Sequence, residues 1–152
     1  KVVEFNARFG DPEAMNTLPV LETSFLDVVT AARDGGPLPE LAFDERATVC
    51  KYAVPDGYPT DPESGAEITV DEESVGDALL FYASVDERDG GLYTTTSRSF
   101  AVVGVAESIA AAERQAEEAL AAAGDGLRVR HDVGKADLVQ RRIDHMNELR
   151  GN

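Results

Sequence analysis

Strand-like runs between residues 47 and 105 constrain the fold of this chain more than any other feature of its sequence. Typical turn sequences separate or end these runs, Pro-Asp-Gly at 55–57 and Asp-Gly-Gly at 89–91. Ser108 then begins the strongest helical pattern of the chain, in which apolar residues recur at helical spacing until Gly124. Strands followed by a helix predict an α+β fold. The four strand-like runs are residues 47–54, 78–85, 92–96 and 99–105.

The first part of the chain has a different pattern. Residues 1–9 alternate between apolar and polar side chains, which predicts a half-buried strand. Asp11 is suitably placed to cap a short helix that has Pro12 at its first position and ends near Pro19. A second helix is expected over residues 24–33 and should stop at the Gly-Gly-Pro sequence that follows.

The stretch 34–39 is the best candidate for a domain boundary, because it is rich in Gly and Pro and each side has its own apolar periodicity. The acidic segment 60–73 is expected to be a loop, and a final helix is expected over residues 135–149. Because the chain starts at Lys1 without Met, we expect it to be part of a longer polypeptide.

Charge limits the partners. The chain has 14 Lys and Arg against 29 Asp and Glu, a formal net charge of −15 at pH 7. Such a charge repels the phosphates of nucleic acid, and no run of about 20 apolar residues could cross a membrane, so neither is an expected partner. An acidic, lysine-poor surface with a single cysteine, Cys50, is typical of a reducing, salt-rich cytoplasm. We therefore expect a cytoplasmic, halophilic protein.

The polar side of the first strand carries the best candidate chemistry. Alternate residues of a strand share one face, so Glu4, Asn6 and Arg8 should point together. Carboxylate and carboxamide oxygens suit Mg²⁺, and a guanidinium can hold a phosphate oxygen through paired hydrogen bonds. On the residues alone, a strand that simply faces solvent explains the same pattern.

A longer sequence motif includes these three residues. Residues 4–13 read Glu-Phe-Asn-Ala-Arg-Phe-Gly-Asp-Pro-Glu, which resembles the signature of the phosphoribosylamine–glycine ligase (glycinamide ribonucleotide synthetase) family of ATP-grasp enzymes. Residues 1–39 would then be the end of an ATP-grasp domain, and 40–152 a small strand-rich C-terminal domain with flanking helices. Further sequences agree in order: Asp-Glu-Arg-Ala at 44–47, Gly-Tyr-Pro at 57–59, Asp-Gly-Gly-Leu at 89–92 and Arg-His-Asp-Val-Gly at 130–134.

The resemblance implies roles for individual residues. Glu4 and Asn6 would ligate Mg²⁺ or Mn²⁺, and Arg8 would be catalytic, lying against the phosphoryl group that ATP transfers. Asp11 would face the amino group of glycine, although capping of a helix explains this residue equally well. The implied reaction joins glycine to 5-phosphoribosylamine through glycyl phosphate, in purine biosynthesis. The upstream N-terminal and ATP-grasp domains would be required partners, so residues 1–152 alone should be inactive.

Three loops depart from the family pattern. Asp56 replaces the first of two glycines before Tyr-Pro, residues 94–97 read Thr-Thr-Thr-Ser instead of Thr-Asn-Gly-Gly, and residues 81–84 read Phe-Tyr-Ala-Ser instead of Phe-His-Ala-Gly. No substrate contact is assigned to these loops.

The first of the two histidines, His131, is expected to be structural. His131 and Asp132 are adjacent, and neighbouring residues of a strand point to opposite faces, so they should not form an acid–base dyad. His145 lies on a polar helical face and should be solvated.

Two other functions stay open at this level. The chain could be a regulatory or assembly module that works without a catalytic half. It could also belong to a different ATP-grasp carboxylate–amine ligase, which would share the metal-binding strand but use another substrate.

Overall fold

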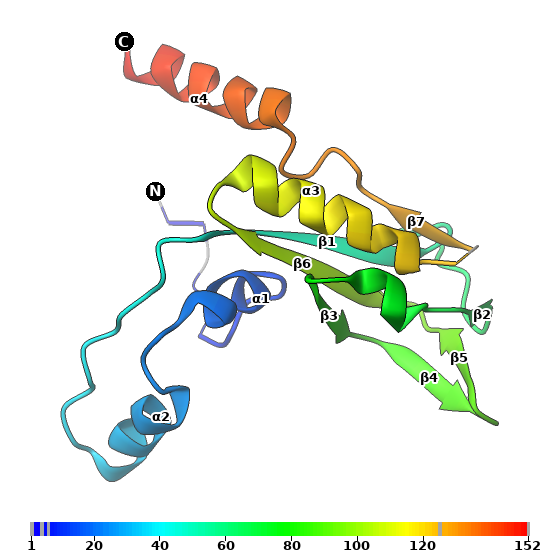
Figure 1. Cartoon of the computed structure of the whole chain (residues 1–152), viewed down its shortest axis with the longest axis horizontal. Coiled ribbons are helices and arrows are strands. Elements are labelled where there is room, and N and C mark those ends of the chain that lie inside the picture. Colours follow the sequence, from blue (N-terminus) through cyan, green and yellow to red (C-terminus); the bar gives the residue numbers. More distant parts are fainter. Residues whose placement is uncertain (1, 4, 6, 125, 152) are drawn as a thin grey trace. The chain divides into compact units, whose positions relative to one another are not determined.

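A computed structural model of the whole chain describes every residue except 1, 4, 6, 125 and 152 (Figure 1). Two compact units make up the chain, residues 1–46 and residues 47–152.

The first unit is helical. Its elements are α1 (Glu13–Thr17), the 3₁₀ helix η1 (Leu18–Val20) and α2 (Phe25–Asp34). The Ser24 side chain accepts a hydrogen bond from the Asp27 backbone N–H at 3.3 Å, and Gly35 ends α2 in a left-handed conformation with φ of 67°. Both predicted helices are therefore confirmed, because their caps and periodicity are local signals.

Two predictions for this segment are wrong. Residues 2, 3, 5 and 7–10 lie in no strand, since the described part of residues 1–46 offers no neighbouring strand to share backbone hydrogen bonds. Pro12, rather than Asp11, occupies the N-cap position of α1, and no side-chain hydrogen bond caps this helix. Glu4 and Asn6 lie outside the described residues.

The second unit contains two antiparallel sheets (Figure 1). The larger sheet has the order β3-β6-β1-β7 and the smaller has the order β2-β5-β4. The strands are β1 (Ala47–Pro55), β2 (Glu67–Ile68), β3 (Leu79–Tyr82), β4 (Val85–Arg88), β5 (Gly91–Thr94), β6 (Phe100–Ala106) and β7 (Leu127–Val129). Together with the helices they confirm the α+β class.

Helix α3 (Ile109–Ala119) packs along β1 and β6 and forms the core with them (Figure 1). Ser108 caps it as predicted, by accepting the Ala111 backbone N–H at 3.3 Å. Gly104 of β6 allows close packing, since a Cβ at this position would lie 1.9 Å from the Ala112 carbonyl oxygen. The core comprises Val49, Ala53, Val75, Ala78, Phe100, Val102, Ala112, Ala116, Ala119, Leu120 and Ala122.

Three further helical elements complete this unit. They are η2 (Glu72–Val75), η3 (Leu120–Ala122) and α4 (Ala136–Arg150). The predicted final helix is confirmed, and no residue of α4 is buried. None of the helices in the described part of the chain is long and apolar enough to cross a membrane.

The predicted strand over 78–85 is two strands in two sheets. Between β3 and β4, the backbone N–H groups of Ala83 and Ser84 donate to the carbonyls of Ser99 and Arg98 at 2.9 Å. The chain thus crosses from one sheet to the other without a typical turn sequence from which two separate strands could be predicted.

Candidate functional site

The structure places only part of the predicted metal and phosphate site. Arg8 is exposed, and its guanidinium donates to the Phe9 carbonyl oxygen at 3.1 Å. Asp11 is also exposed. Among the residues that the structure describes, no group of three or more His, Cys, Asp or Glu side chains could hold a metal ion. The proposed ligands Glu4 and Asn6 lie outside that set, so their ligation stays a prediction from the sequence.

An apolar hollow lies in the unit of residues 1–46. The rings of Phe9 and Phe25 meet edge to face there, with centroids 5.6 Å apart. This lining offers few polar atoms, so the hollow suits an apolar side chain better than a phosphate or a metal. Its lining residues are Phe9, Thr17, Leu18, Leu21, Phe25, Val28, Leu41 and Phe43.

The most elaborate polar constellation of the described residues is centred on Lys51 of β1. Lys51 alternates with Val49 and Ala53 on the side of the strand that faces α3, and the residue is only 1% exposed. Its ammonium group donates to Glu113 Oε1 at 2.6 Å, to Glu117 Oε2, and to the His131 carbonyl oxygen at 3.0 Å. Each of its three N–H groups therefore has an acceptor, which is the condition for burying such a charge.

The two carboxylates of this network also bind a second partner. Glu113, 4% exposed, accepts from Lys135 Nζ at 2.8 Å. Glu117 Oε1 lies 2.7 Å from His131 Nδ1. We call these five residues the Lys51 network; it ties β1, α3 and the segment between β7 and α4 together.

Electrostatics within the network favours ionised carboxylates. Burial opposes ionisation of Glu113, but the hydrogen bonds from Lys135 and Lys51 outweigh it and lower the pKa of this carboxyl. Burial likewise opposes ionisation of Glu117, and hydrogen bonds from Lys51 and His131 lower its pKa below the ordinary value. The hydrogen bond to Glu113 stabilises the charged ammonium group of Lys135 and raises the pKa of Lys135.

As predicted, His131 and Asp132 do not form an acid–base dyad. The Asp132 carboxylate accepts from Arg130 at 2.6 and 2.7 Å, and this contact lowers its pKa to about 2. His131 instead contacts Glu117. Both residues lie in a turn rather than a strand, so the expected geometry was wrong while the separation of their roles was right. His145 is exposed, as expected.

Sequence reasoning missed the Lys51 network, although one signal was present. Lys51 occupies an inward position of an alternating strand, and Glu113 neighbours Ala112 on the apolar side of the next helix. Charged residues at such positions indicate a buried ion pair. Their pairing, 62 residues apart along the chain, could not be derived from spacing.

Known proteins share this fold. A crystal structure of phosphoribosylamine–glycine ligase from Thermotoga maritima matches 86% of this chain and 32% of its own, with 31% identity and a TM-score of 0.72. Curated relatives called phosphoribosylamine–glycine ligase match 99% of the chain, at 58% identity in Methanosarcina barkeri and 51% in Methanocaldococcus jannaschii. The chain spans about a third of the length of these relatives, 35% and 34%.

The fold and these similarities define the class, an α+β domain that occurs in ligases. A family model described as phosphoribosylglycinamide synthetase, C domain, matches residues 48–136. This chain belongs to that family.

Proposed function

We propose that this chain is the C-terminal part of an ATP-dependent ligase that joins glycine to 5-phosphoribosylamine in purine biosynthesis. The observation that carries the proposal is the similarity to relatives of that name, 48–58% identical over 98–99% of the chain. The family model disfavours an ATP-grasp ligase of another substrate class. In the proposed reaction, the γ-phosphoryl group of ATP passes to the glycine carboxylate. The amine of phosphoribosylamine then attacks glycyl phosphate, an amide forms and phosphate leaves.

Four residues of the N-terminal segment would take part. Glu4 and Asn6 supply one carboxylate and one carboxamide oxygen, a donor set that suits Mg²⁺ or Mn²⁺. Such a metal, when bound, offsets charge on the phosphate oxygens of ATP. The exposed Arg8 guanidinium is free of acidic partners in the described part of the chain and would hold the transferring phosphoryl group. Asp11 would accept hydrogen bonds from the glycine ammonium group.

Exposed apolar side chains support a larger domain around this segment. In residues 1–46 no side chain of α1 or α2 is buried, and Phe5 is 88% exposed. Apolar surface of this density normally contacts another protein surface. We infer that residues 1–39 are the end of an ATP-grasp domain whose remainder covers them. The exposed set is Val2, Val3, Phe5, Phe9, Leu18, Phe25, Leu26, Val29, Leu38, Leu41 and Phe43.

The test is the substrate requirement of the longer polypeptide that contains this chain. ADP release should require glycine and phosphoribosylamine together, and residues 1–152 alone should release none. ADP release that depends on another carboxylate and amine would assign the chain to a different ligase. A longer polypeptide that does not consume ATP with any such pair would contradict the enzymatic proposal and favour an assembly module.

A further inference from the structure

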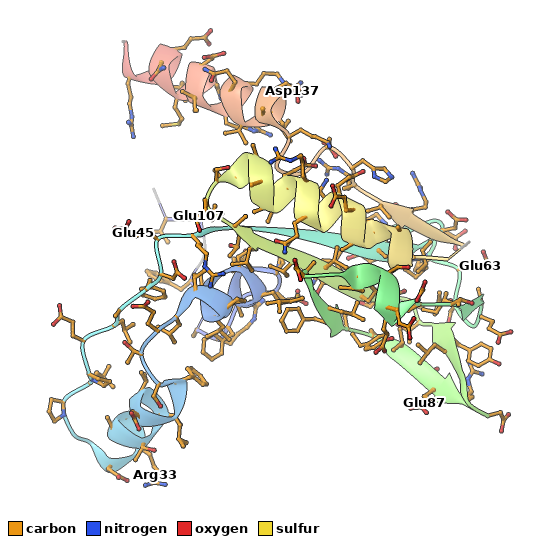
Figure 2. The ribbon with its side chains drawn as sticks, in the orientation of Figure 1. Arg33, Glu45, Glu63, Glu87, Glu107 and Asp137 are labelled. Carbon is orange, nitrogen blue, oxygen red and sulfur yellow. The ribbon has the colours of Figure 1, made fainter. Side chains whose placement is uncertain are left out.

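Helix α4 has two chemically distinct faces. At about 100° per residue, its five large apolar side chains and two arginines, Arg142 and Arg150, fall on one side of the helix. All three of its acidic residues fall on the opposite side, and Figure 2 shows one of them, Asp137, in the first turn. We call the first side the apolar–basic face; it comprises Leu138, Val139, Arg142, Ile143, Met146, Leu149 and Arg150.

Two of the three acidic residues of α4, Asp137 and Asp144, have partners within the helix. Arg141 lies 3.3 Å from the Asp137 carboxylate, and Gln140 donates to Asp144 at 2.8 Å. In contrast, Arg142 and Arg150 make no side-chain ion pair within the part of the chain that the structure describes. Arg142 and Arg150 therefore border apolar side chains without an acidic partner among the described residues.

The apolar–basic face is open to solvent. Ile143 is 47% exposed, Met146 43% and Leu149 68%. A helix of 15 residues is only marginally stable in water without tertiary contacts. A surface that covers this face would remove the apolar area from water and stabilise the helix.

The Lys51 network fixes where α4 begins. Lys135 is the N-cap residue of α4, and its side chain binds Glu113 of α3 at 2.8 Å. Just before it, Gly134 has a φ of 81°, and a Cβ there would lie 2.9 Å from Val49 of β1. The start of α4 is thus held against the core, while the apolar–basic face remains available.

Similarity to relatives points to the occupant. The C-domain family model ends at residue 136, where α4 begins, whereas the relatives match 98–99% of the chain. The relatives are about three times as long as this chain. We propose that α4 is a docking helix whose apolar–basic face packs into an apolar groove bordered by carboxylates, on the part of the ligase polypeptide that lies outside residues 1–152. This proposal rests on the proposed function.

Two other occupants are less suitable. Pairing of α4 with α4 of a second copy would bring the arginines of two apolar–basic faces together, and the net charge of −15 makes two copies repel. The same net charge opposes approach to an anionic membrane surface. A groove with its own carboxylates would instead pair with Arg142 and Arg150.

Hydrogen exchange of residues 143–150 tests the docking. In the longer polypeptide, these amides should exchange at least about tenfold more slowly than in the chain 1–152. Ile143→Glu and, separately, Arg142→Glu should abolish this difference, while Asn147→Glu, which places the same charge outside the face, should preserve it. Ile143 and Arg142 lie outside the core, so the melting of the remaining structure should not change.

Each other outcome overturns the proposal. Equal exchange in the two polypeptides would exclude docking onto the added chain. Protection that grows with the concentration of residues 1–152 would indicate a second copy. Protection that requires phosphatidylglycerol vesicles would indicate a membrane surface. Because ADP release is measured separately, an inactive ligase with a protected helix refutes the proposed function and leaves the docking intact.

Discussion

Replacing Lys51 by Met tests whether the Lys51 network holds the C domain together. Methionine keeps most of the side-chain volume and removes the charge and all three donors. Glu113 and Glu117 then each lose a partner inside the protein, and the His131 carbonyl loses its donor. Removing one partner of a buried ion pair lowers the free energy of unfolding by about 3–5 kcal/mol, because the other partner remains buried without a compensating charge.

The structure sets the magnitude within that range. Glu113 keeps Lys135 at 2.8 Å, and Glu117 keeps His131 at 2.7 Å, so neither carboxylate is left without a partner. We therefore expect a loss at the lower end, about 3 kcal/mol of unfolding free energy. In a unit of roughly 100 residues this lowers Tm by at least about 12 °C.

Urea unfolding followed by circular dichroism measures the loss, and Arg114→Met is the matched control. Arg114 is an exposed cation on α3, so its replacement should change stability by no more than about 0.5 kcal/mol. Adding Glu113→Gln to Lys51→Met should restore part of the loss, because the two carboxylates that Lys51 bridged then no longer repel each other. If Lys51→Met unfolds like Arg114→Met, the network contributes no measurable stability and this reasoning is refuted.

Three further predictions concern stability. The pKa values of Glu113 and Glu117 are lowered in the folded protein, so the stability that these carboxylates contribute is present above the ordinary Glu pKa of about 4.3 and is lost as the pH falls through the folded-state values. Tm should therefore drop as the pH falls below about 4.3, and less steeply in the variant that carries both Glu113→Gln and Glu117→Gln. With a net charge of −15, Tm should rise from 0.1 to 1 M KCl as the Debye length shrinks from about 10 to 3 Å, and a flat or falling curve would contradict salt adaptation. Gly134→Ala should lower the free energy of unfolding, measured in urea, by about 2 kcal/mol or more, and by more than Gly126→Ala does. Both glycines have positive φ, but of the two only Gly134 has a close neighbour, so equal losses would contradict the packing argument.

The parts of the fold that sequence predicted correctly depend on local signals. The strands β1 and β6, the Ser108 cap of α3 and the helix α4 each follow from a period or a cap that a few consecutive residues carry. The short strands β2 and β7 have two and three residues, too few to establish a period. The division of residues 78–85 between two sheets depends on bonds to Arg98 and Ser99, which no local pattern encodes.

The candidate functional site was also predictable from the sequence only in part. The motif from Glu4 to Glu13 predicts a ligase from the sequence alone, and the relatives that match 99% of the chain agree with it. The strand on which Glu4, Asn6 and Arg8 were expected to align is absent from the described residues of this segment, because a strand needs neighbours to accept its hydrogen bonds. The Lys51 network joins side chains 62 and 66 residues apart, so only the three-dimensional structure could assign its pairs.

The most direct test of the proposed ligase site is kcat as a function of Mg²⁺ concentration for the longer polypeptide with Glu4→Gln. Glu22→Gln is the matched control, because Glu22 is an exposed carboxylate of the same unit that has no proposed role. Loss of a charged metal ligand should reduce kcat at least about 100-fold and raise the Mg²⁺ concentration needed for half-maximal activity. A Glu4→Gln variant that matches Glu22→Gln in both kcat and Mg²⁺ dependence would contradict the metal-site assignment.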